Sequence, residues 1–371
     1  MRFDHRPLGF FVVLLPPTVL ACGTRLGWPI LAFALFVACS PITRYVFNVY
    51  RPGPLQITEG LAKALYALPA CYLLVLTLAI VDFERSIPTL VLSGPLHVAA
   101  GALSLWTVMV FGLFPSHEMF HRRSPVWIRA GAIASGICGY PLWPGEHMAH
   151  HRSRGALATR DAAEVEQGPW TFTRQRLRSV LAAAIDTEKA LHAHFKGQVI
   201  GPMSWATLAM VCTALSFWWF AGYPGICVYI ISALGVTFAA QLMTYVQHWG
   251  LDEAELDSAG VDEAAWEDDC LMQAWLTLAN SLHAAHHRDP EIPYFHLQPQ
   301  SDSPRQPGCY VVMLVLCIVP GLWRKIMRPV REAYLQSCPT VCHPGRRVIC
   351  IRPALALVRE RQSNPSEDTK E

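Results

Sequence analysis

The chain alternates between long apolar segments and shorter polar ones. A helix that crosses a membrane needs about 20 mostly apolar residues, and six segments approach or exceed that length. They are residues 8–22, 27–42, 61–81, 88–114, 203–223 and 225–246. The pattern therefore predicts an all-α fold, an integral membrane bundle of about six transmembrane helices. Two further apolar segments, 126–143 and 309–323, are interrupted or short, and we expect them to be re-entrant, interfacial or buried.

Lysine and arginine are distributed unevenly between the two sides of this bundle. With a cytoplasmic N-terminus, the outside loops hold only Arg25 and Arg85, and the loop near Gly222 holds neither residue type. The other side holds eleven basic residues between 116 and 202 and twelve after 279. Because basic residues are in excess in cytoplasmic loops, we expect a multi-pass protein of the cell (inner) membrane with both large polar segments in the cytoplasm.

The two ends of the chain carry separate signals. The first apolar segment follows basic residues, as in a signal peptide, but the second apolar segment follows at once. We therefore interpret the start as a helical hairpin rather than a cleaved signal. The polar residues 353–371 predict a disordered tail after a membrane domain that covers 1–352.

Composition supports the membrane interpretation. Apolar residues make up 52% of the chain and charged residues 16%, whereas soluble proteins average about a quarter charged. The net charge of +2 gives no reason to expect a nucleic-acid partner. The twelve cysteines lack the regular spacing of a disulfide framework, and we expect them to be reduced.

Nine of the fifteen histidines fall in four short motifs. The motifs are HEMFH, HMAHH, the single histidine of YVQHWGL, and HAAHH, which together contain His117, His121, His147, His150, His151, His248, His283, His286 and His287. Residues three or four apart share one face of a helix, so a motif with several histidines can aim them at one point. All four motifs lie at the predicted cytoplasmic face, which forms a histidine-rich helical cap. Nine nitrogens are too many for one ion and suit two ions with four or five ligands each.

The alternatives to such a metal site are a structural role and a zinc hydrolase. A lone histidine is usually a core or surface residue, but four motifs on one face argue against that explanation. A hydrolytic zinc site needs fewer histidines and a nearby carboxylate, although zinc itself stays open. A small zinc site could also use a loose pattern near the end of the chain, Cys338, Cys342, His343 and Cys350. The histidines outside the motifs are expected to take no part in the main site: they are His5, His97, His192, His194, His296 and His343.

The motifs and their neighbours resemble those of the membrane alkane hydroxylases, a branch of the fatty acid desaturase and hydroxylase superfamily. HEMFHR is similar to the first histidine box, EHMAHHRSRGALATRDAAEVEQG to the second, and NSLHAAHHRDPEIPYFHL to the third. TYVQHWGL resembles the NYxxHYGL element of that branch, and PGLWRKIMRPV its closing segment. The second box departs from the pattern, with two residues between His147 and His150 instead of three. The chain therefore looks like a divergent member, whose substrate need not be a plain alkane.

The resemblance implies a membrane-bound, non-haem di-iron monooxygenase. The nine motif histidines would bind two iron ions (Fe2+/Fe3+), with O2 as co-substrate and an unactivated C–H bond of an alkyl or fatty-acyl-like chain as the target. No separate protein nucleophile or base is expected. Asp161 and Glu166 match polar positions near the second box, and we expect them either to orient ligand imidazoles or to be solvated loop carboxylates.

The sequence contains neither a Rossmann glycine fingerprint nor a rubredoxin-like C-x2-C pair. Electrons are therefore expected from a rubredoxin or ferredoxin with its reductase. The arginines between Arg122 and Arg178 could dock such an acidic partner, or serve lipid headgroups. Two other functions stay open. One is desaturation or epoxidation of an acyl chain by the same di-iron site. The other is a transporter or structural membrane protein with bound metal, and the near absence of charge within the six apolar segments argues against an ion pathway.

A substrate path is expected along the fourth apolar segment. Trp106 precedes His117 by eleven residues, close to three helical turns, so it would lie about 16 Å deeper on nearly the same face. Val110 lies between them on that face. A substrate chain would pass Val110 and meet the indole of Trp106; alternatively, Trp106 packs against another helix or lies near lipid.

Overall fold

The computed structural model describes six stretches of the chain, residues 6–47, 57–122, 124–152, 161–194, 200–251 and 265–337. These stretches are helical and contain no β-strand, apart from a single bridge between Glu267 and Arg305. The prediction of an all-α fold is therefore confirmed for the described residues. The predicted tail at 353–371, the cysteine pattern that begins at Cys338, and His5 and His343 lie outside them.

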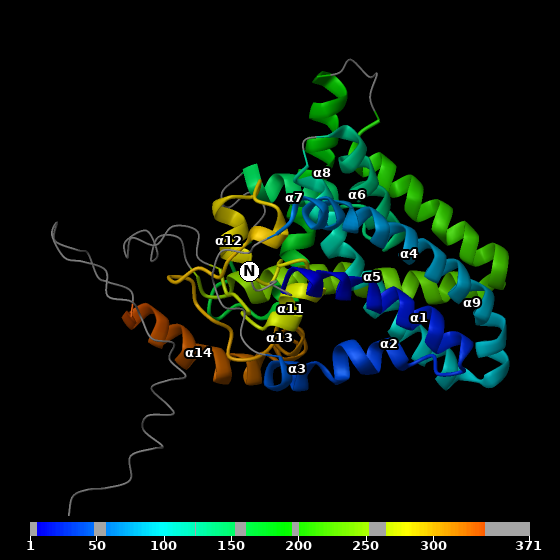
Figure 1. Ribbon diagram of the computed structural model, residues 1–371, viewed down its shortest axis with the longest axis horizontal. Helices are drawn as coiled ribbons and strands as arrows, with labels where there is room; N and C mark the ends of the chain where they lie inside the picture. Colours follow the sequence, from blue (N-terminus) through cyan, green and yellow to red (C-terminus); the bar gives the residue numbers. More distant parts are fainter. Residues whose placement is uncertain are drawn as a thin grey trace, which may run out of the picture.

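Among the described residues, four helices are long and apolar enough to cross a membrane. The first, Arg6–Arg25, joins the 3-10 helix η1 (Arg6–Leu14) to α1 (Leu15–Arg25). The others are α4 (Glu59–Ser93), α5 (Pro95–Phe120) and α9 (Pro202–His248). Figure 1 shows these helices packed side by side. Their length and composition support a membrane-spanning bundle, and the number of spans stays a prediction.

Helix α9 consists of two antiparallel helices joined at Gly222. The backbone leaves the helical conformation there, with φ of 59° and ψ of −142°, a left-handed φ that glycine adopts without strain. The rings of Phe217 and Tyr229, on either side of the turn, lie 5.0 Å apart, whereas a continuous helix would separate these positions by about 18 Å. The two apolar segments predicted at 203–223 and 225–246 are thus both present.

The boundary between the third and fourth predicted segments is displaced. We expected a loop between 81 and 88, where charged residues interrupt the apolar pattern. Instead, α4 continues through them and the chain turns at Gly94, whose φ is 108°. The two acids have partners in the bundle, since Arg25 pairs with Asp82 at 2.6 Å and Ser216 Oγ donates to Glu84 at 2.6 Å. Asp82 is neutralised by an arginine and the Glu84 carboxyl is hydrogen-bonded, so the helix does not end at these acids.

The second predicted segment, 27–42, is not one helix, and this expectation is wrong. The chain divides there into α2 (Leu31–Phe33), the π-helical turn η2 (Ala34–Ala38) and α3 (Ser40–Val46). Pro41 has no backbone N–H and cannot continue the hydrogen bonds of the preceding turn, and the N–H of Cys39 bonds to the carbonyl of Ala34, five residues back. A broken helical connection therefore replaces the expected span.

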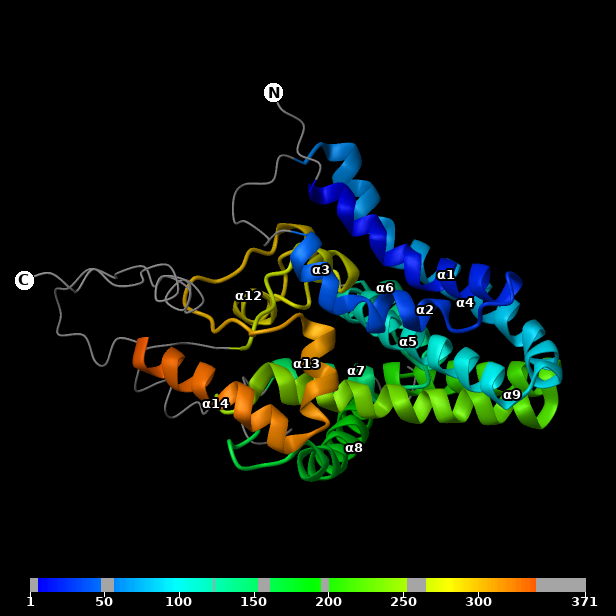
Figure 2. The ribbon, with the colours of Figure 1, turned by 90° about the horizontal axis from the view of Figure 1, so that it is seen from below.

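Most of the shorter helices gather at one end of the long ones (Figures 1 and 2). They are α7 (Trp143–Arg152), α11 (Leu271–Leu276), α12 (His283–Arg288), the 3-10 turn η3 (Tyr294–His296), α13 (Tyr310–Cys317) and α14 (Pro320–Ser337). Helix α8 (Pro169–His194) packs against α7 and α9. Helix α6 (Pro125–Ile137) packs against α5 and α9, so the interrupted apolar segment 126–143 belongs partly to the bundle.

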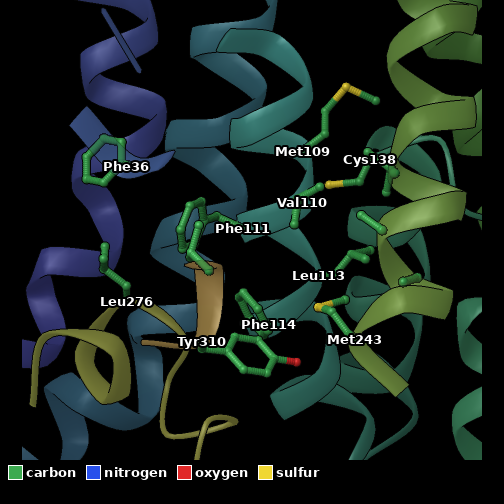
Figure 3. Packing of buried hydrophobic residues seen from close by; sticks show 14 of the residues in the cluster. Phe36, Met109, Val110, Phe111, Leu113, Phe114, Cys138, Met243, Leu276 and Tyr310 are labelled. Carbon is green, nitrogen blue, oxygen red and sulfur yellow. The ribbon is translucent and has the colours of Figure 1, made fainter. Parts of the chain in front are cut away.

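Helix α5 is enclosed by its neighbours and leads to the histidine motifs. Its side chains from Thr107 to Met119 are all buried. Figure 3 shows how its apolar residues meet side chains of α9 and α13 in the core; the labelled ones are Val110, Phe111, Leu113, Phe114, Met243 and Tyr310. A packed apolar core thus holds the end of α5 that carries His117.

Reporter tags can test the orientation predicted from the basic residues. Tags inserted at Gly94 and Gly222 should report the outside, because each glycine precedes a long helical segment whose other end carries a motif histidine, His117 for α5 and His248 for α9. A tag after His194 and one at the C-terminus should report the cytoplasm, where basic residues accumulate. Glycosylation or alkaline phosphatase fusion would measure this. An outside signal after His194 would contradict the orientation.

Candidate metal centre

Five of the motif histidines converge at the end of the bundle, and we call them the five-histidine group. They are His117 at the end of α5, His121 directly after it, His147 and His151 on α7, and His286 on α12. One nitrogen from each lies within 4.8 Å of those of the others. The Nε2 atoms of His121 and His147 are 2.6 Å apart, and those of His151 and His286 are 3.2 Å apart.

The other four motif histidines form a second cluster, the four-histidine group. It contains His150 on α7, His248 at the end of α9, and His283 and His287 on α12, again with nitrogens within 4.8 Å of one another. Nε2 of His287 lies 2.7 Å from that of His150 and 2.9 Å from that of His283. The structure therefore brings together all nine histidines that the sequence singled out, including the isolated His248.

Helical geometry explains how each HxxHH motif serves both groups. Successive residues of an α-helix point about 100° apart, and residues four apart point in nearly the same direction. On α7, His147 and His151 therefore face the five-histidine group, while His150 faces the four-histidine group. On α12 the roles are exchanged, since His283 and His287 face the four-histidine group and His286 the other. Two short helices thereby link two neighbouring sites.

The arrangement of the nitrogens fits a metal ion in each group. Two ligand nitrogens with metal bonds of about 2.1 Å at a right angle lie about 3.0 Å apart, and the closest nitrogen pairs in the two groups lie 2.6 to 3.2 Å apart. Nε2 of His248 is buried without a hydrogen-bond partner among the described residues, which a cation would correct. An all-imidazole donor set suits iron, zinc or copper.

Burial favours the neutral form of several histidines in each group. It lowers the pKa of His147, His283, His286 and His287 well below the usual value, and repulsion from neighbouring imidazoles lowers it further. Burial also lowers the pKa of His121 to about 4. Because only neutral imidazole binds a metal ion, these five histidines can bind one without first losing a proton.

Asp161 contacts one member of the four-histidine group, His150, on the side of its ring that faces away from the other histidines. Its Oδ2 lies 2.6 Å from Nδ1 of His150, whose Nε2 faces the other histidines. The carboxylate therefore accepts from the Nδ1–H and leaves Nε2 free to bind a metal ion. Asp161 is buried, so this position agrees with the orienting role expected from the sequence.

A network of buried side chains extends this contact into α8 and α9. Arg176 donates to Asp161 through Nε at 3.0 Å and Nη2 at 2.6 Å, and through Nη1 to Glu146 and, at 2.7 Å, to Gln241. Tyr140 donates to Glu146 and accepts from Gln241 at 2.7 Å. Burial alone would lower the pKa of Arg176, but the two carboxylates raise it above its ordinary value, so the guanidinium stays charged.

The sequence carried a signal for this network that we did not use. Arg176 lies four residues from both Phe172 and Val180, and all three are buried on one face of α8. An arginine on an otherwise apolar helical face usually needs a buried acidic partner. Glu146 lies in the apolar run PLWPGEHM and is that partner.

Glu166 does not lie near the histidines, and the orienting role suggested for it is not supported. Its side chain is 75% exposed and forms an ion pair with Arg328 of α14. The two carboxylates are five residues apart in a segment without regular helix, so their distance in sequence could not show which one turns inward. Among the histidines outside the motifs, His192 and His194 are exposed, as expected, and His97 lies near the start of α5, at the end opposite to His117.

Replacing Asp161 by asparagine should weaken metal binding while preserving side-chain size. Loss of the carboxylate behind His150 should lower metal affinity by about 10–100-fold, as is typical for such supporting groups. Metal retention during chelator titration of the purified protein measures this. Glu166→Gln is the matched control and should retain metal as the parent does. Equal retention in both variants would show that Asp161 has no such role.

The two residues predicted along the substrate path lie in packed surroundings. A side chain added at Gly235 of α9 would meet the Trp106 ring at 2.7 Å, so this half-buried indole packs closely on α9. Val110 is 9% exposed and belongs to the apolar core of α5 (Figure 3). Trp106 therefore packs against another helix, as one of the two expectations stated. Its role in substrate binding stays a prediction.

Comparison with protein families gives one match. The family model described as fatty acid desaturase matches residues 93–308. The matched region begins before α5 and ends before α13, so it contains all nine motif histidines.

Several characterised proteins are similar to the chain. Alkane 1-monooxygenase 1 of Pseudomonas aeruginosa is 26% identical over 242 residues, 62% of this chain and 63% of that protein. Alkane 1-monooxygenase 2 of Alcanivorax borkumensis is 21% identical over 361 residues, 92% of this chain and 94% of that protein. The xylene/toluene monooxygenase hydroxylase component XylM of Pseudomonas putida is 29% identical over 273 residues, 70% and 71% of the two chains. The chain thus spans less than two thirds of the P. aeruginosa relative.

Proposed function

Because the chain belongs to the fatty acid desaturase family, as the match over more than half of its length shows, we propose that it is a membrane-bound, non-haem di-iron monooxygenase. Its substrate would be a hydrophobic molecule with an unactivated C–H bond. The observation that carries this proposal is the pair of adjacent groups in which nine buried or half-buried histidines converge. The likeness to alkane 1-monooxygenases agrees with the resemblance of the histidine motifs to the alkane hydroxylases.

The five-histidine group would hold one iron ion and the four-histidine group the other. When bound, the two irons supply the activation of O2 and the oxidation of the C–H bond. The protein contributes the rest: α7 and α12 hold the two sites side by side, and Asp161 orients His150. The buried core of α5 and α9 keeps water from the site. Asp161 and Arg176 have no direct part in the chemistry, because neither faces the point where the imidazole nitrogens converge.

The proposed reaction consumes two electrons and two protons. One substrate C–H bond and one O2 molecule give an alcohol and water, and the electrons come from a rubredoxin or ferredoxin with its reductase. The relatives are named for alkanes and for xylene or toluene, which supports a hydrocarbon or fatty-acyl-like substrate. We place the site on the cytoplasmic side of the cell (inner) membrane, where such electron carriers are found.

Isotope labelling can separate hydroxylation from the runner-up, desaturation or epoxidation of an acyl chain. In ¹⁸O2, hydroxylation adds one ¹⁸O atom to a saturated substrate and removes no hydrogen overall. Desaturation removes two hydrogens and adds no oxygen, and epoxidation adds one ¹⁸O atom only to a substrate that already has a double bond. Mass spectrometry of products from saturated and unsaturated chains therefore distinguishes all three. A product two mass units lighter and without ¹⁸O would overturn hydroxylation.

The proposed substrate path predicts that Trp106 limits chain length. Trp106→Ala or Trp106→Ser should remove the indole that packs on Gly235 and make room below Val110. Product yields across a homologous series of chain lengths should then shift toward longer substrates, with iron content unchanged. Trp219→Ala is the control, because Trp219 is 82% exposed on α9. An unchanged length profile in both variants would remove Trp106 from the path.

A further inference from the structure

Helix α14 presents a basic face next to the four-histidine group. Four of its residues are basic and one is acidic. Three of the basic ones lie on one open side of the helix, and one of these, Arg328, forms the ion pair with Glu166; the residues on this side are Gly321, Arg324, Lys325, Arg328, Pro329 and Glu332. By contrast, the arginine stretch from Arg122 to Arg178 that the sequence suggested for docking contains buried members. Arg122 and Arg176 are both internal.

The inner face of α14 is packed against the loop that follows His248. Trp323 is fully buried, and its ring lies 5.7 Å from those of Tyr245 and Trp249. Arg331 Nε donates to the carbonyl of Gly250, one residue further along. The surface of α14 is therefore connected to His248 through a buried tryptophan pair, Trp323 and Trp249, and one peptide unit.

The features of α14 favour a soluble protein over a lipid as the occupant of this face. A helix that lies on a bilayer buries its apolar face in the lipid, but α14 uses Trp323 and Met327 to pack inward. Figure 2 shows α14 running away from the long helices toward the far side of the cap. Lipid binding would account for the basic residues but not for the tryptophan pair beneath them.

We propose that the basic face of α14 is the docking site of an acidic iron–sulfur electron carrier, and that electrons enter through Trp323 and Trp249. The inference rests on the proposed function, because it concerns how that reaction is supplied with electrons. In each encounter the reduced carrier would lose one electron to the iron held by the four-histidine group, so two encounters would supply the two electrons that one O2 requires. Charge complementarity steers the carrier to the surface, and the aromatic pair bridges the protein between the surface and His248.

Reversal of charge on α14 tests the docking site directly. The probe is an acidic rubredoxin that supports turnover, and the measurement is its Kd for the full-length protein in nanodiscs at increasing ionic strength. Arg324→Glu/Lys325→Glu should weaken binding at least about tenfold at low salt and flatten the salt dependence. Lys189→Glu, which changes a lysine with 75% side-chain exposure on α8, should leave the Kd unchanged.

The binding result separates docking from the proposed function and from lipid binding. An unchanged Kd in the α14 variant would overturn the docking site, even if the protein hydroxylates its substrate. A weakened Kd would support it, even if the reaction proved to be desaturation. If the variant changes only the thermal stability in nanodiscs of anionic lipid and not the Kd for rubredoxin, the face binds lipid and the proposal fails.

Replacement of the buried tryptophans tests the electron path. Trp323→Leu should slow the oxidation of prebound, reduced rubredoxin at least about tenfold, with Kd and metal content retained, and Trp323→Phe should recover much of the rate. Trp275→Leu is the control, since this tryptophan packs near Phe47 and Gly9, away from α14. Equal rates in the parent, Trp323→Leu and Trp249→Leu would show that electrons take another route.

Discussion

Alanine in place of His286 or His150 is expected to abolish oxygenation and to lower the iron content of the purified protein. His286 belongs to the five-histidine group and His150 to the four-histidine group, so the two variants remove one ligand from each site. Both side chains are buried, and the space left cannot be filled by a neighbouring donor. Iron per chain and product yield, measured on the same preparation, should fall together.

His248→Ala tests the ligand assignment more stringently, because His248 is the single histidine of its sequence motif. It reaches the cluster only because α9 ends there, and we expect His248→Ala to lower iron content as His286→Ala does. His192→Ala, at an exposed position of α8, should retain iron and activity. Full iron and full activity in His248→Ala would show that the four-histidine group is not a metal site.

Among the substitutions proposed here, Arg176→Met should lower the free energy of unfolding the most. The variant leaves Glu146 and Asp161 buried without their partner, and side chains of all three are at most 2% exposed. Removal of one member of a buried ion pair costs about 3–5 kcal/mol. The free energy of unfolding, from denaturant titration of the purified protein, measures this loss.

Two controls make the stability result specific to the buried network. Arg174→Met changes an exposed arginine on the same helix and should alter stability by less than about 0.5 kcal/mol. Arg176→Met/Glu146→Gln/Asp161→Asn removes the unpaired charges and should recover part of the loss. If Arg176→Met is as stable as Arg174→Met, the network does not hold the site together.

The nine histidines could be identified from the sequence because helical spacing and the positions of basic residues act over short distances. Spacing of three and four residues aims the imidazoles of one motif together, and the apolar segments carry the motifs to one face. Their division into groups of five and four depends on how α7 and α12 are rotated against α5 and α9. That rotation is set by packing between helices, which no single motif contains.

The parts that the sequence misplaced depend on contacts between distant residues. The loop expected near Asp82 and Glu84 is helix, because Arg25 and Ser216 lie beside these acids in the folded bundle. Likewise, Asp161 turns toward His150 while Glu166 turns toward Arg328. In most of these pairs the two residues are separated by tens of residues or more. The charge pattern of the sequence therefore shows where an acidic residue lies but not which residue it contacts.

Metal analysis of the purified protein shows whether the two histidine groups bind two iron ions. The protein should be purified without added metal from cells grown in iron-containing medium, and iron, zinc and copper should be measured per chain in a preparation of known activity. We expect about two irons per chain, one for each ligand group, and activity proportional to iron. Active protein that contains zinc or copper and no iron would contradict this expectation.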